Sequence, residues 1–365
     1  MQHWFEITNT DEVLSPALLF YPERIQQNIG RMIAIAGSAD RLRPHVKTYK
    51  CREVVNMQME AGISKFKCAT LAEAEMVARC GVKDVLLAYP LVGPNKKRFI
   101  QLTAQYPEIR FSVLVDHEEQ IAGWKSLVGT EGTVQVFIDL DAGMHRTGTI
   151  PELADSLVSQ LDDPAFIFRG WHCYDGHIHQ TDFAERQVAV DQQYKSILDL
   201  VNRHGLEDKE FICGSSISFP IHAQHPERTL SPGTTLLWDH GYSTKFPDLH
   251  FDVAAMLLAR VVTKPGKDLL CIDLGYKAVA SEMKEAPVFF PQLPDAEIQT
   301  HSEEHLVIKT NKAEKWTIGD VVYGIPWHIC PTVALYDEAA IVHHRLVNDY
   351  WSIEARIRHH RINES

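Results

Sequence analysis

A short β-rich run near residue 45 ends in two lysines, Lys47 and Lys50. In a barrel of parallel strands, the carboxyl ends of the strands surround the active site, so a lysine there faces its mouth. A lysine removed from water can lose its proton and form a Schiff base with a carbonyl compound or with pyridoxal phosphate. The alternative is that both lysines are solvated charges at a strand end, and position alone favours that alternative.

A second strand end runs from Phe137 into a loop flanked by Gly143 and Gly148. Arg146 in this loop would project toward the same mouth, where its guanidinium group can hydrogen-bond an anionic oxygen. Taken by itself, a surface arginine is the simpler interpretation.

Two Gly- and Ser-rich segments, Cys213–Ser218 and Ser231–Thr235, follow the last two strands that we expect in the barrel. Such loops commonly hold a phosphate through backbone N–H groups and hydroxyls, and glycine permits close approach. The candidate phosphate-binding residues are Gly214, Ser215, Ser216, Gly233 and Thr234. Glycine and serine also simply form turns, so each segment is a weak signal alone.

His328 and Cys330 form a His-x-Cys pair near the C-terminus. On a strand, this spacing places both side chains on one face, where they can hold zinc and leave positions open to water and substrate. A core histidine beside a buried cysteine is the commoner arrangement. The adjacent histidines of His343-His344 and His359-His360 cannot easily point together on a strand, and we interpret them as solvated or structural.

The elements that must position these residues change character along the chain. Up to about residue 240, short β-rich runs alternate with helical patterns, which predicts an α/β protein with a (β/α)₈ TIM barrel. The predicted strands are Ala17–Tyr21, Leu42–Lys47, Lys65–Ala69, Asp84–Tyr89, Phe111–Asp116, Val134–Leu140, Phe168–Tyr174 and Glu210–Gly214. The clearest predicted helices are Pro22–Ala36, Arg52–Glu60, Leu71–Arg79, Pro94–Gln105 and Phe183–His204.

After about residue 245, strand-like runs separated by Gly and Pro turns predict an all-β domain. These runs are Ala255–Val262, Leu269–Leu274, Leu306–Lys309, Val321–Gly324 and Ala339–Val342. We therefore expect a barrel domain at residues 15–245 and a β-domain at residues 246–365 that includes residues 1–14.

Composition narrows the class of protein. The 365 residues, of which 45% are hydrophobic, are enough for one large barrel and a smaller domain. The formal charge of −12 argues against nucleic acid as a partner, because an acidic surface repels phosphate backbones. Seven widely spaced cysteines without a secretory leader favour a cytoplasmic protein, and no apolar run is long enough for a membrane helix.

Together these segments resemble the D-threonine aldolase and D-serine dehydratase family, whose members share an alanine-racemase-like barrel (fold type III) and bind pyridoxal phosphate. The resemblance runs along nearly the whole chain, in the order of the family's motifs. Those motifs are R-P-H-x-K-T-H-K at Arg43–Lys50, D-x-G-x-x-R-x-G at Asp141–Gly148, H-x-Y-D-G-H at Trp171–His179, S-E-E-H at Ser302–His305 and P-x-H-x-C-P-T at Pro326–Thr332.

The resemblance implies roles for the candidate residues. Lys47, not Lys50, aligns with the Schiff-base lysine, and Arg146 lies beside the cofactor ring. Tyr174 and the loops at Gly214 and Gly233 surround the phosphate, and His328 and Cys330 bind the metal. This chain departs from the family at Tyr49, which replaces a histidine, and at Ser215–Ser218, which replaces a Gly/Thr-rich loop.

The activity that the resemblance implies is a metal-dependent lyase reaction on a β-hydroxy-D-amino acid, with retro-aldol cleavage to glycine and an aldehyde as the favoured route. Elimination to a 2-oxo acid and ammonia, as in D-serine dehydratase, is the alternative, and Cys330 is typical of the dehydratases. His177, His179 or His305 would supply a base, and we favour His177. Zinc suits a His-Cys pair, although manganese serves relatives with His-x-Asp.

Three further expectations follow from the same resemblance. An amino-acid racemase is the second enzymatic interpretation, since the loop Gly143–Gly148 also resembles alanine racemase. A non-catalytic carrier of pyridoxal phosphate is disfavoured, because it would have no use for the β-domain or its His-x-Cys pair. Related enzymes are dimers, which implies a homodimer.

Overall fold

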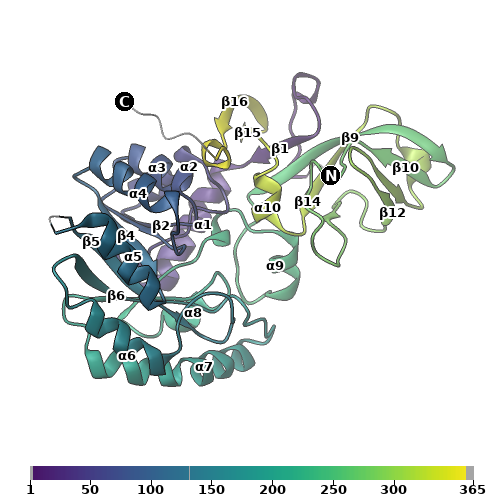
Figure 1. The fold of residues 1–365 in the computed structure, drawn as a ribbon. Helices are drawn as coiled ribbons and strands as arrows, with labels where there is room; N and C mark the ends of the chain where they lie inside the picture. Colours follow the sequence, from purple (N-terminus) through teal and green to yellow (C-terminus); the bar gives the residue numbers. More distant parts are fainter. Residues whose placement is uncertain (1–2, 131, 359–365) are drawn as a thin grey trace. The chain divides into compact units, whose positions relative to one another are not determined.

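A computed structural model describes residues 3–130 and 132–358 of the chain (Figure 1). Its contacts divide it into two compact units. The barrel unit comprises Arg31–Lys47 and Val55–Gly233, and the sheet unit comprises Thr48–Val54, Thr234–Arg356 and the N-terminal residues as far as Gly30. In the described part of the chain, no helix combines the length and apolar character needed to cross a membrane.

The barrel unit is built on a seven-stranded parallel sheet in the order β2-β3-β4-β5-β6-β7-β8. Its strands are β2 (Lys65–Cys68), β3 (Asp84–Leu87), β4 (Arg110–Val115), β5 (Val134–Asp141), β6 (Phe166–Tyr174), β7 (Glu210–Cys213) and β8 (Arg228–Leu230). Leu42 bridges to Leu230 on β8, and His45 bridges to Lys67 on β2. The segment at residues 42–45 therefore joins the two edge strands of this sheet and completes the barrel.

The parallel strands are apolar along most of their length because both faces are covered. In β4, for example, every residue after Arg110 is buried. Helices cover the outer face of the strands (Figure 1). The helices of the whole chain are α1 (Pro22–Ala36), α2 (Arg52–Glu60), α3 (Leu71–Arg79), α4 (Pro94–Gln105), α5 (Glu118–Val128), α6 (Pro151–Gln160), α7 (Phe183–His204), α8 (Phe219–His222), α9 (His240–Lys245) and α10 (Ile329–Val333).

The sheet unit contains nine strands, seven of them in the order β12-β13-β10-β9-β1-β15-β16, with β14 paired to β9 and β11 paired to β14. Their bounds are β1 (Ala17–Phe20), β9 (Ala255–Gly266), β10 (Leu269–Ile272), β11 (Val288–Phe289), β12 (Glu297–His301), β13 (Leu306–Lys309), β14 (Val321–Pro326), β15 (Glu338–His343) and β16 (Leu346–Ser352). Alternate residues of β1, β9 and β15 bury one face against Phe5, Ile7 and Tyr323.

The fold class is confirmed, but three details of the expected barrel are wrong. Ala17–Phe20 is a strand, yet it pairs with β9 and β15 in the sheet unit and not with a barrel strand. The segment at residues 42–47 forms isolated bridges instead of a regular strand, and the last barrel strand is β8. The division into domains at residues 15–245 and 246–365 stays a prediction.

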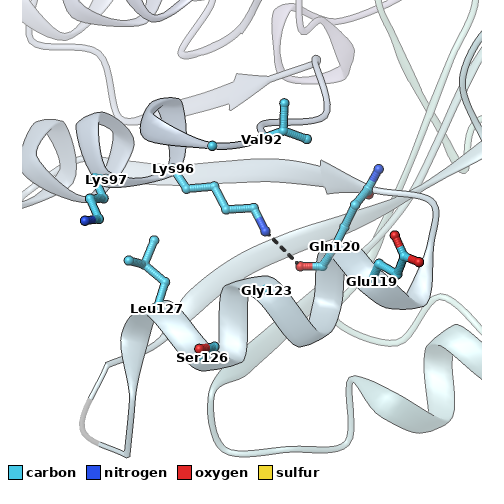
Figure 2. A pocket seen from close by; sticks show the side chains of 9 residues that line it. Val92, Lys96, Lys97, Glu119, Gln120, Gly123, Ser126 and Leu127 are labelled. Carbon is cyan, nitrogen blue, oxygen red and sulfur yellow. Dashed lines mark hydrogen bonds between the residues drawn. The ribbon is translucent and has the colours of Figure 1, made fainter.

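A groove of about 460 Å³ lies between α4 and α5 of the barrel unit (Figure 2). The side chain of Lys96 spans it, and its Nζ donates to the backbone carbonyl of Gln120 at 3.1 Å. The same Nζ lies 5.0 Å from the centre of the Trp124 ring. Because Lys96 is hydrogen-bonded and packed against an aromatic ring, we assign no chemistry to this groove.

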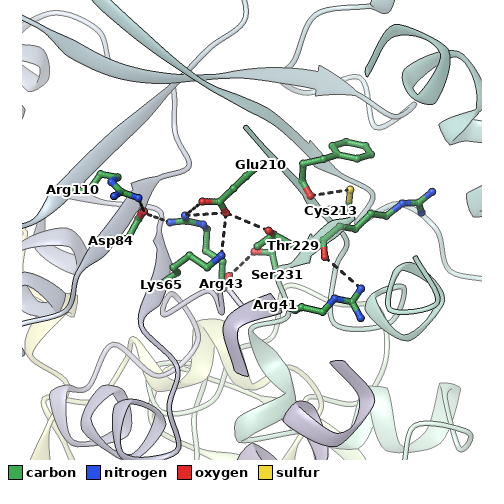
Figure 3. Close-up of polar contacts among 11 residues, drawn as sticks. Arg41, Arg43, Lys65, Asp84, Arg110, Glu210, Cys213, Thr229 and Ser231 are labelled. Atoms are coloured by element: carbon green, nitrogen blue, oxygen red, sulfur yellow. Dashed lines mark hydrogen bonds and ion pairs between the residues drawn. The ribbon is translucent and has the colours of Figure 1, made fainter. Parts of the chain in front are cut away.

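The amino-terminal ends of the barrel strands are closed by a charged cluster (Figure 3). Arg43, which is fully buried, donates to Asp84 Oδ1 at 2.6 Å and to Glu210 Oε1 at 3.0 Å. Arg110 pairs with Asp84 at 3.2 Å, and Lys65 pairs with Glu210 at 3.4 Å. We call these five residues the closing cluster. Because the closing cluster lies at the first residues of the strands, Arg43 is at the end of the barrel opposite to the carboxyl ends of the strands.

Candidate active site

The carboxyl ends of the barrel strands enclose a pocket, which we call the mouth pocket. Lys47 follows the segment that bridges β8 and β2, Tyr174 ends β6, and Arg146 lies in the loop after β5. The lining residues are His45, Lys47, Lys67, Ala88, Leu114, Asp139, Met144, Arg146, Thr147, His172 and Tyr174. Three of the residues singled out from the sequence, Lys47, Arg146 and Tyr174, therefore lie in one pocket. Lys50 is not among its lining residues.

Three cationic side chains converge on the ring of Tyr174. Lys47 Nζ lies 5.6 Å from the ring centre, Lys67 Nζ lies 5.8 Å from it, and Arg146 Cζ lies 5.1 Å from it. An aromatic face attracts cations but does not neutralise them. The mouth pocket therefore has a net positive field and favours a ligand with negative charge.

Lys67 is the member of this group that sequence reasoning missed. It lies in β2 and is almost completely buried, and its Nζ is 3.4 Å from His172 Nε2. His172 Nδ1 in turn lies 2.7 Å from Asp139 Oδ1. Burial, reinforced by the charge of Lys47, lowers the pKa of Lys67 to about 7. The strand carries two lysines, Lys65 and Lys67, and the sequence alone gave no signal that separates them.

The loop that carries Arg146 is fixed by Asp141. This carboxylate accepts hydrogen bonds from the backbone N–H groups of Gly143 at 2.9 Å and His145 at 3.1 Å. Although burial opposes the charged form, these bonds lower the pKa of Asp141. Gly148 has a φ of +100°, and a Cβ there would lie 2.6 Å from the backbone nitrogen of Asp141, so only glycine fits this turn.

The two Gly/Ser segments of the barrel unit meet at the ends of β7 and β8. The backbone N–H of Gly233 donates to Ser216 Oγ at 3.2 Å, and that of Ser215 donates to Ser218 Oγ at 2.9 Å. A Cβ on Gly233 would lie 3.0 Å from the carbonyl oxygen of His45, and Gly214 has a φ of +90°. Both glycines are therefore required by the close packing of the chain here, and we call this Gly/Ser turn the cradle.

A buried network supports this cradle from below. Ser218 Oγ donates to Asp175 Oδ1 at 2.7 Å, and His222 Nε2 lies 2.8 Å from Asp175 Oδ2. Arg228 Nη1 lies 2.8 Å from His222 Nδ1, which must accept because arginine only donates. His222 is therefore the tautomer that donates from Nε2 to Asp175. Burial opposes ionisation of Asp175, but His222 and Ser218 hold its pKa below the usual range.

His177 lies outside the residues that line the mouth pocket. Its Nε2 is 2.6 Å from Gln193 Oε1, and its buried Nδ1 has no hydrogen-bond partner among the described residues. With an oxygen as partner, Nε2 is the donor, so Nδ1 keeps its lone pair and can accept a proton. The other two candidate bases, His179 and His305, are exposed.

His328 and Cys330 lie in the sheet unit, but not on a strand. His328 is the extended residue that precedes α10, and Cys330 is in the first turn of this helix. The expected strand is therefore wrong at this point, and Pro331 was the signal, because proline is favoured in the first turn of a helix. The two side chains nevertheless meet in a hydrogen-bonding contact.

The His-Cys pair has further polar neighbours within the sheet unit. His328 Nδ1 hydrogen-bonds to Glu282 Oε1, and Cys330 Sγ lies 3.1 Å from Thr48 Oγ1 and 3.4 Å from Thr234 Oγ1. Thr234 is thus placed beside the cysteine. Burial opposes the charged imidazole, but Cys330 and Glu282 raise the pKa of His328 to about 9. Within residues 3–130 and 132–358, no group of three or more His, Cys, Asp or Glu side chains is arranged to hold a metal.

The remaining histidine pairs do not form a site in the described structure. His343 Nδ1 pairs with Glu23 at 3.2 Å, and His344 has a positive φ of 48° in a turn. His359 and His360 lie outside the described residues.

A barrel of parallel strands with a cationic mouth, followed in the chain by a separate mainly antiparallel sheet, defines an alanine-racemase-like protein. Residues 22–240 match the family "Alanine racemase, N-terminal domain", and the chain belongs to this family. Residues 254–342 match a second family, "Putative serine dehydratase domain".

Known relatives extend along the whole chain. A D-threonine aldolase of Arthrobacter sp. is 27% identical over 94% of this chain and 92% of its own length. The crystal structure of D-threonine aldolase from Filomicrobium marinum has a TM-score of 0.86 and 24% identity, covering 98% of this chain and 99% of that one. D-threo-3-hydroxyaspartate dehydratase from Delftia sp. HT23 has a TM-score of 0.79 and 22% identity, covering 93% and 97%.

Proposed function

We propose that this protein is a lyase, dependent on pyridoxal phosphate and a divalent metal, that cleaves β-hydroxy-D-amino acids to glycine and an aldehyde. The observation that carries the proposal is the convergence of Lys47, Lys67 and Arg146 on Tyr174 at the strand ends of the barrel. The long match to a D-threonine aldolase supports the choice of substrate class.

The chemistry of the mouth pocket fits pyridoxal phosphate. In the proposal, Lys47 holds the aldehyde carbon, Arg146 binds an anionic oxygen beside the ring, and Tyr174 lies near the phosphate. The phosphate is held by Gly214, Ser215, Ser216 and Gly233, where a Cβ on Gly233 would approach backbone within 3.0 Å, and by Thr234. When bound, the cofactor accepts the electron pair of the bond that breaks at Cα.

Three residues of the chain have separate roles in the proposed reaction. Lys47 would hold the cofactor through its Nζ and would be released as a free amine when the amino group of the substrate takes its place. His177, which Gln193 holds outside the lining of the mouth pocket, is the proposed base for the proton of the β-hydroxyl, and a base in this role would have to reach the pocket when substrate is bound. Arg146 binds a carboxylate or phenolic oxygen and so orients the bond to be broken.

His328 and Cys330 suit a divalent metal. Glu282 contacts Nδ1 of His328, as carboxylates commonly do with metal-binding histidines, and this leaves Nε2 for the ion beside the cysteine thiolate. Variants of the hydroxyaspartate dehydratase in which a histidine, or a cysteine two positions later, is replaced by alanine have been solved, and the cysteine variant is in a metal-free form. We propose zinc, which suits this donor pair and acts as a Lewis acid toward a hydroxyl group, with manganese as the alternative.

Elimination to a 2-oxo acid and ammonia is the second candidate, and Cys330 is the observation that favours it. The relative with the cysteine variant in metal-free form is a dehydratase. Both routes would use the same residues, and they differ in whether the Cα–Cβ bond or the Cα–H bond is broken first.

Product analysis separates these reactions. The purified full-length protein would be given pyridoxal phosphate and zinc, then D-threonine or D-serine, and assayed for glycine, aldehyde, 2-oxo acid and ammonia. Glycine with acetaldehyde supports the proposal, whereas a 2-oxo acid with ammonia makes the protein a dehydratase. Exchange of the α-proton without bond cleavage, unaffected by chelation, would instead identify an amino-acid racemase.

The proposed enzyme is a cytoplasmic homodimer. All seven cysteines lie within the described residues and none of them forms a disulfide bond, which supports a reducing compartment. The dimer is supported by the resemblance to dimeric enzymes. Light scattering coupled to size-exclusion chromatography tests it by measuring the molar mass in solution.

A further inference from the structure

Lys67 has a polar environment that the proposed reaction does not use. Its side chain lines the mouth pocket although only 2% of the residue is exposed. His45, at the end of the bridging segment, pairs with Lys67 through the backbone, so the lysine lies on the edge strand β2 where the bridging segment meets it. It is thus held on the wall of the pocket and not in solvent.

One hydrogen bond of the Lys67 amine is accounted for by His172. Asp139 Oδ1 lies 2.7 Å from His172 Nδ1, and a carboxylate oxygen accepts a hydrogen bond, so His172 donates from Nδ1. Nε2 of the same ring therefore accepts from the amine of Lys67. Burial, aided by the positive charge of Lys67, lowers the pKa of His172 and keeps the ring neutral. The Lys67 amine has at least one more N–H group, and the pocket is the direction in which a ligand can meet it.

The charges around Lys67 leave it poised between its two protonation states. The lysine and arginine side chains near Lys67 oppose protonation of its amine, whereas the nearby carboxylates favour protonation. The charged and titratable groups that line the pocket with Lys67 are His45, Lys47, Asp139, Arg146, His172 and Tyr174, and the charges of Arg43 and Asp175 also act on it. An anion that entered the pocket would tip this balance toward the ammonium form.

We propose that Lys67 is an anion-binding residue of the mouth pocket, which hydrogen-bonds an anionic oxygen of the ligand and takes up a proton as the ligand binds. The oxygen is the phenolic oxygen of pyridoxal phosphate or the carboxylate of the amino acid. The inference rests on the proposed function, because it requires that this pocket be the cofactor site.

Calorimetry of the full-length apo-protein tests the inference with a probe that cannot react with Lys47. Pyridoxine 5′-phosphate, which lacks the aldehyde, would be titrated at about pH 8 in two buffers with different ionisation enthalpies, since there the Lys67 amine is largely neutral without ligand. The wild type should take up about one proton more than Lys67→Met. Loss of a hydrogen bond to a charged group should also weaken binding by about 10- to 100-fold.

A second titration distinguishes the two sources of the oxygen. If the phenolic oxygen is the partner, the extra proton is taken up with pyridoxine 5′-phosphate. If the carboxylate is the partner, it is taken up when D-alanine, which has no β-hydroxyl to cleave, binds to the protein loaded with pyridoxal phosphate. Equal proton uptake and equal affinity in the wild type and Lys67→Met, in both titrations, would overturn the inference.

Lys65→Met is the matched control, because Lys65 lies two residues earlier on the same strand and pairs with Glu210 in the closing cluster. This variant should bind both ligands as the wild type does. Lys67→Gln provides a second, polar but uncharged replacement, and circular dichroism checks that each variant is folded. If the wild type binds neither ligand, the cofactor proposal itself fails. If the wild type binds both ligands but takes up no more protons than Lys67→Met, only the proposed role of Lys67 fails.

Discussion

The two ends of the barrel place buried cations in opposite circumstances. In the closing cluster, burial opposes the charge of Arg43, but Asp84 and Glu210 outweigh it and raise the pKa of the guanidinium. At the mouth, Lys67 is equally buried and contacts a histidine, and its pKa falls to about 7. A buried cation with carboxylate partners is locked in its charged form, whereas one without a direct carboxylate contact is free to exchange a proton.

This difference separates residues that are close in the sequence. Arg43 and Lys47 belong to one motif, but Arg43 lies in the closing cluster at the amino-terminal ends of the barrel strands, whereas Lys47 lines the mouth pocket at their carboxyl ends. Arg43 therefore serves the fold, while Lys47 serves the chemistry. Conservative changes at the closing cluster should alter stability, and changes at the mouth should alter ligand binding.

The largest effect on activity is expected for Lys47→Ala. Without the amine, the protein cannot link covalently to pyridoxal phosphate, so lyase activity should be abolished. Absorbance spectra of the loaded protein should lose the band of lysine-bound cofactor, and thermal unfolding of the apo-protein should change little. A normal band in this variant would mean that another lysine, with Lys67 the nearest candidate, holds the cofactor.

The largest effect on stability is expected for Asp84→Asn. The substitution leaves Arg43 buried with one carboxylate fewer and also removes the partner of Arg110. Breaking a buried ion pair on one side costs about 3–5 kcal/mol, which urea unfolding would measure. The double variant Arg43→Met/Asp84→Asn should recover part of this loss. A cost below about 1 kcal/mol would show that the cluster is not a stabilising element.

How far the sequence predicts this molecule depends on whether the signal is local. The helices Pro22–Ala36, Leu71–Arg79 and Phe183–His204 are confirmed to the residue, because apolar periodicity and caps such as Thr70 and Asp182 lie within each segment. The sheet to which a strand belongs is not encoded locally. Ala17–Phe20 is a strand by its own pattern, and only pairing with β9 and β15 assigns it to the sheet unit.

The same distinction applies to the candidate site. Lys47, Arg146 and Tyr174 could be found because strand ends of a parallel barrel meet at one mouth. Lys67 could not be ranked above any other strand lysine, because its role depends on contacts with His172 and, through it, Asp139, which lie on other strands far along the chain. Tertiary contacts, not residue type, make it a candidate.

The pH dependence of stability should reveal Lys67 in the apo-protein. Lys67 has a pKa near 7 in the folded protein and a higher pKa in the unfolded chain. Above pH 7, the folded protein therefore binds fewer protons than the unfolded chain, and the free energy of unfolding rises with pH. The same increase is lost as the pH falls toward 7. From pH 7 to 9, the wild type should gain about 2 kcal/mol more than Lys67→Met in urea unfolding. Parallel curves for the two proteins would contradict the lowered pKa.

A smaller effect is expected for Ser218→Ala, next to the proposed phosphate site. The change removes the acceptor of the Ser215 N–H and one donor to Asp175. Loss of a buried hydrogen bond costs about 1–2 kcal/mol, and a less ordered cradle should weaken the binding of pyridoxal phosphate by about tenfold. Fluorescence titration with the cofactor measures the second effect, and unchanged affinity would place the phosphate elsewhere.

The smallest effect is expected for Arg110→Met at the rim of the closing cluster. Arg110 pairs with Asp84, but its side chain is 49% exposed, and water screens such a pair. Asp84 keeps its shorter contact with the buried Arg43, so the loss in unfolding free energy should stay below about 1 kcal/mol. Cofactor affinity should be unchanged, because the mouth lies at the other end of the strands. If Arg110→Met instead weakened cofactor binding, the two ends of the barrel would be coupled, and the separation of stability from chemistry would not hold.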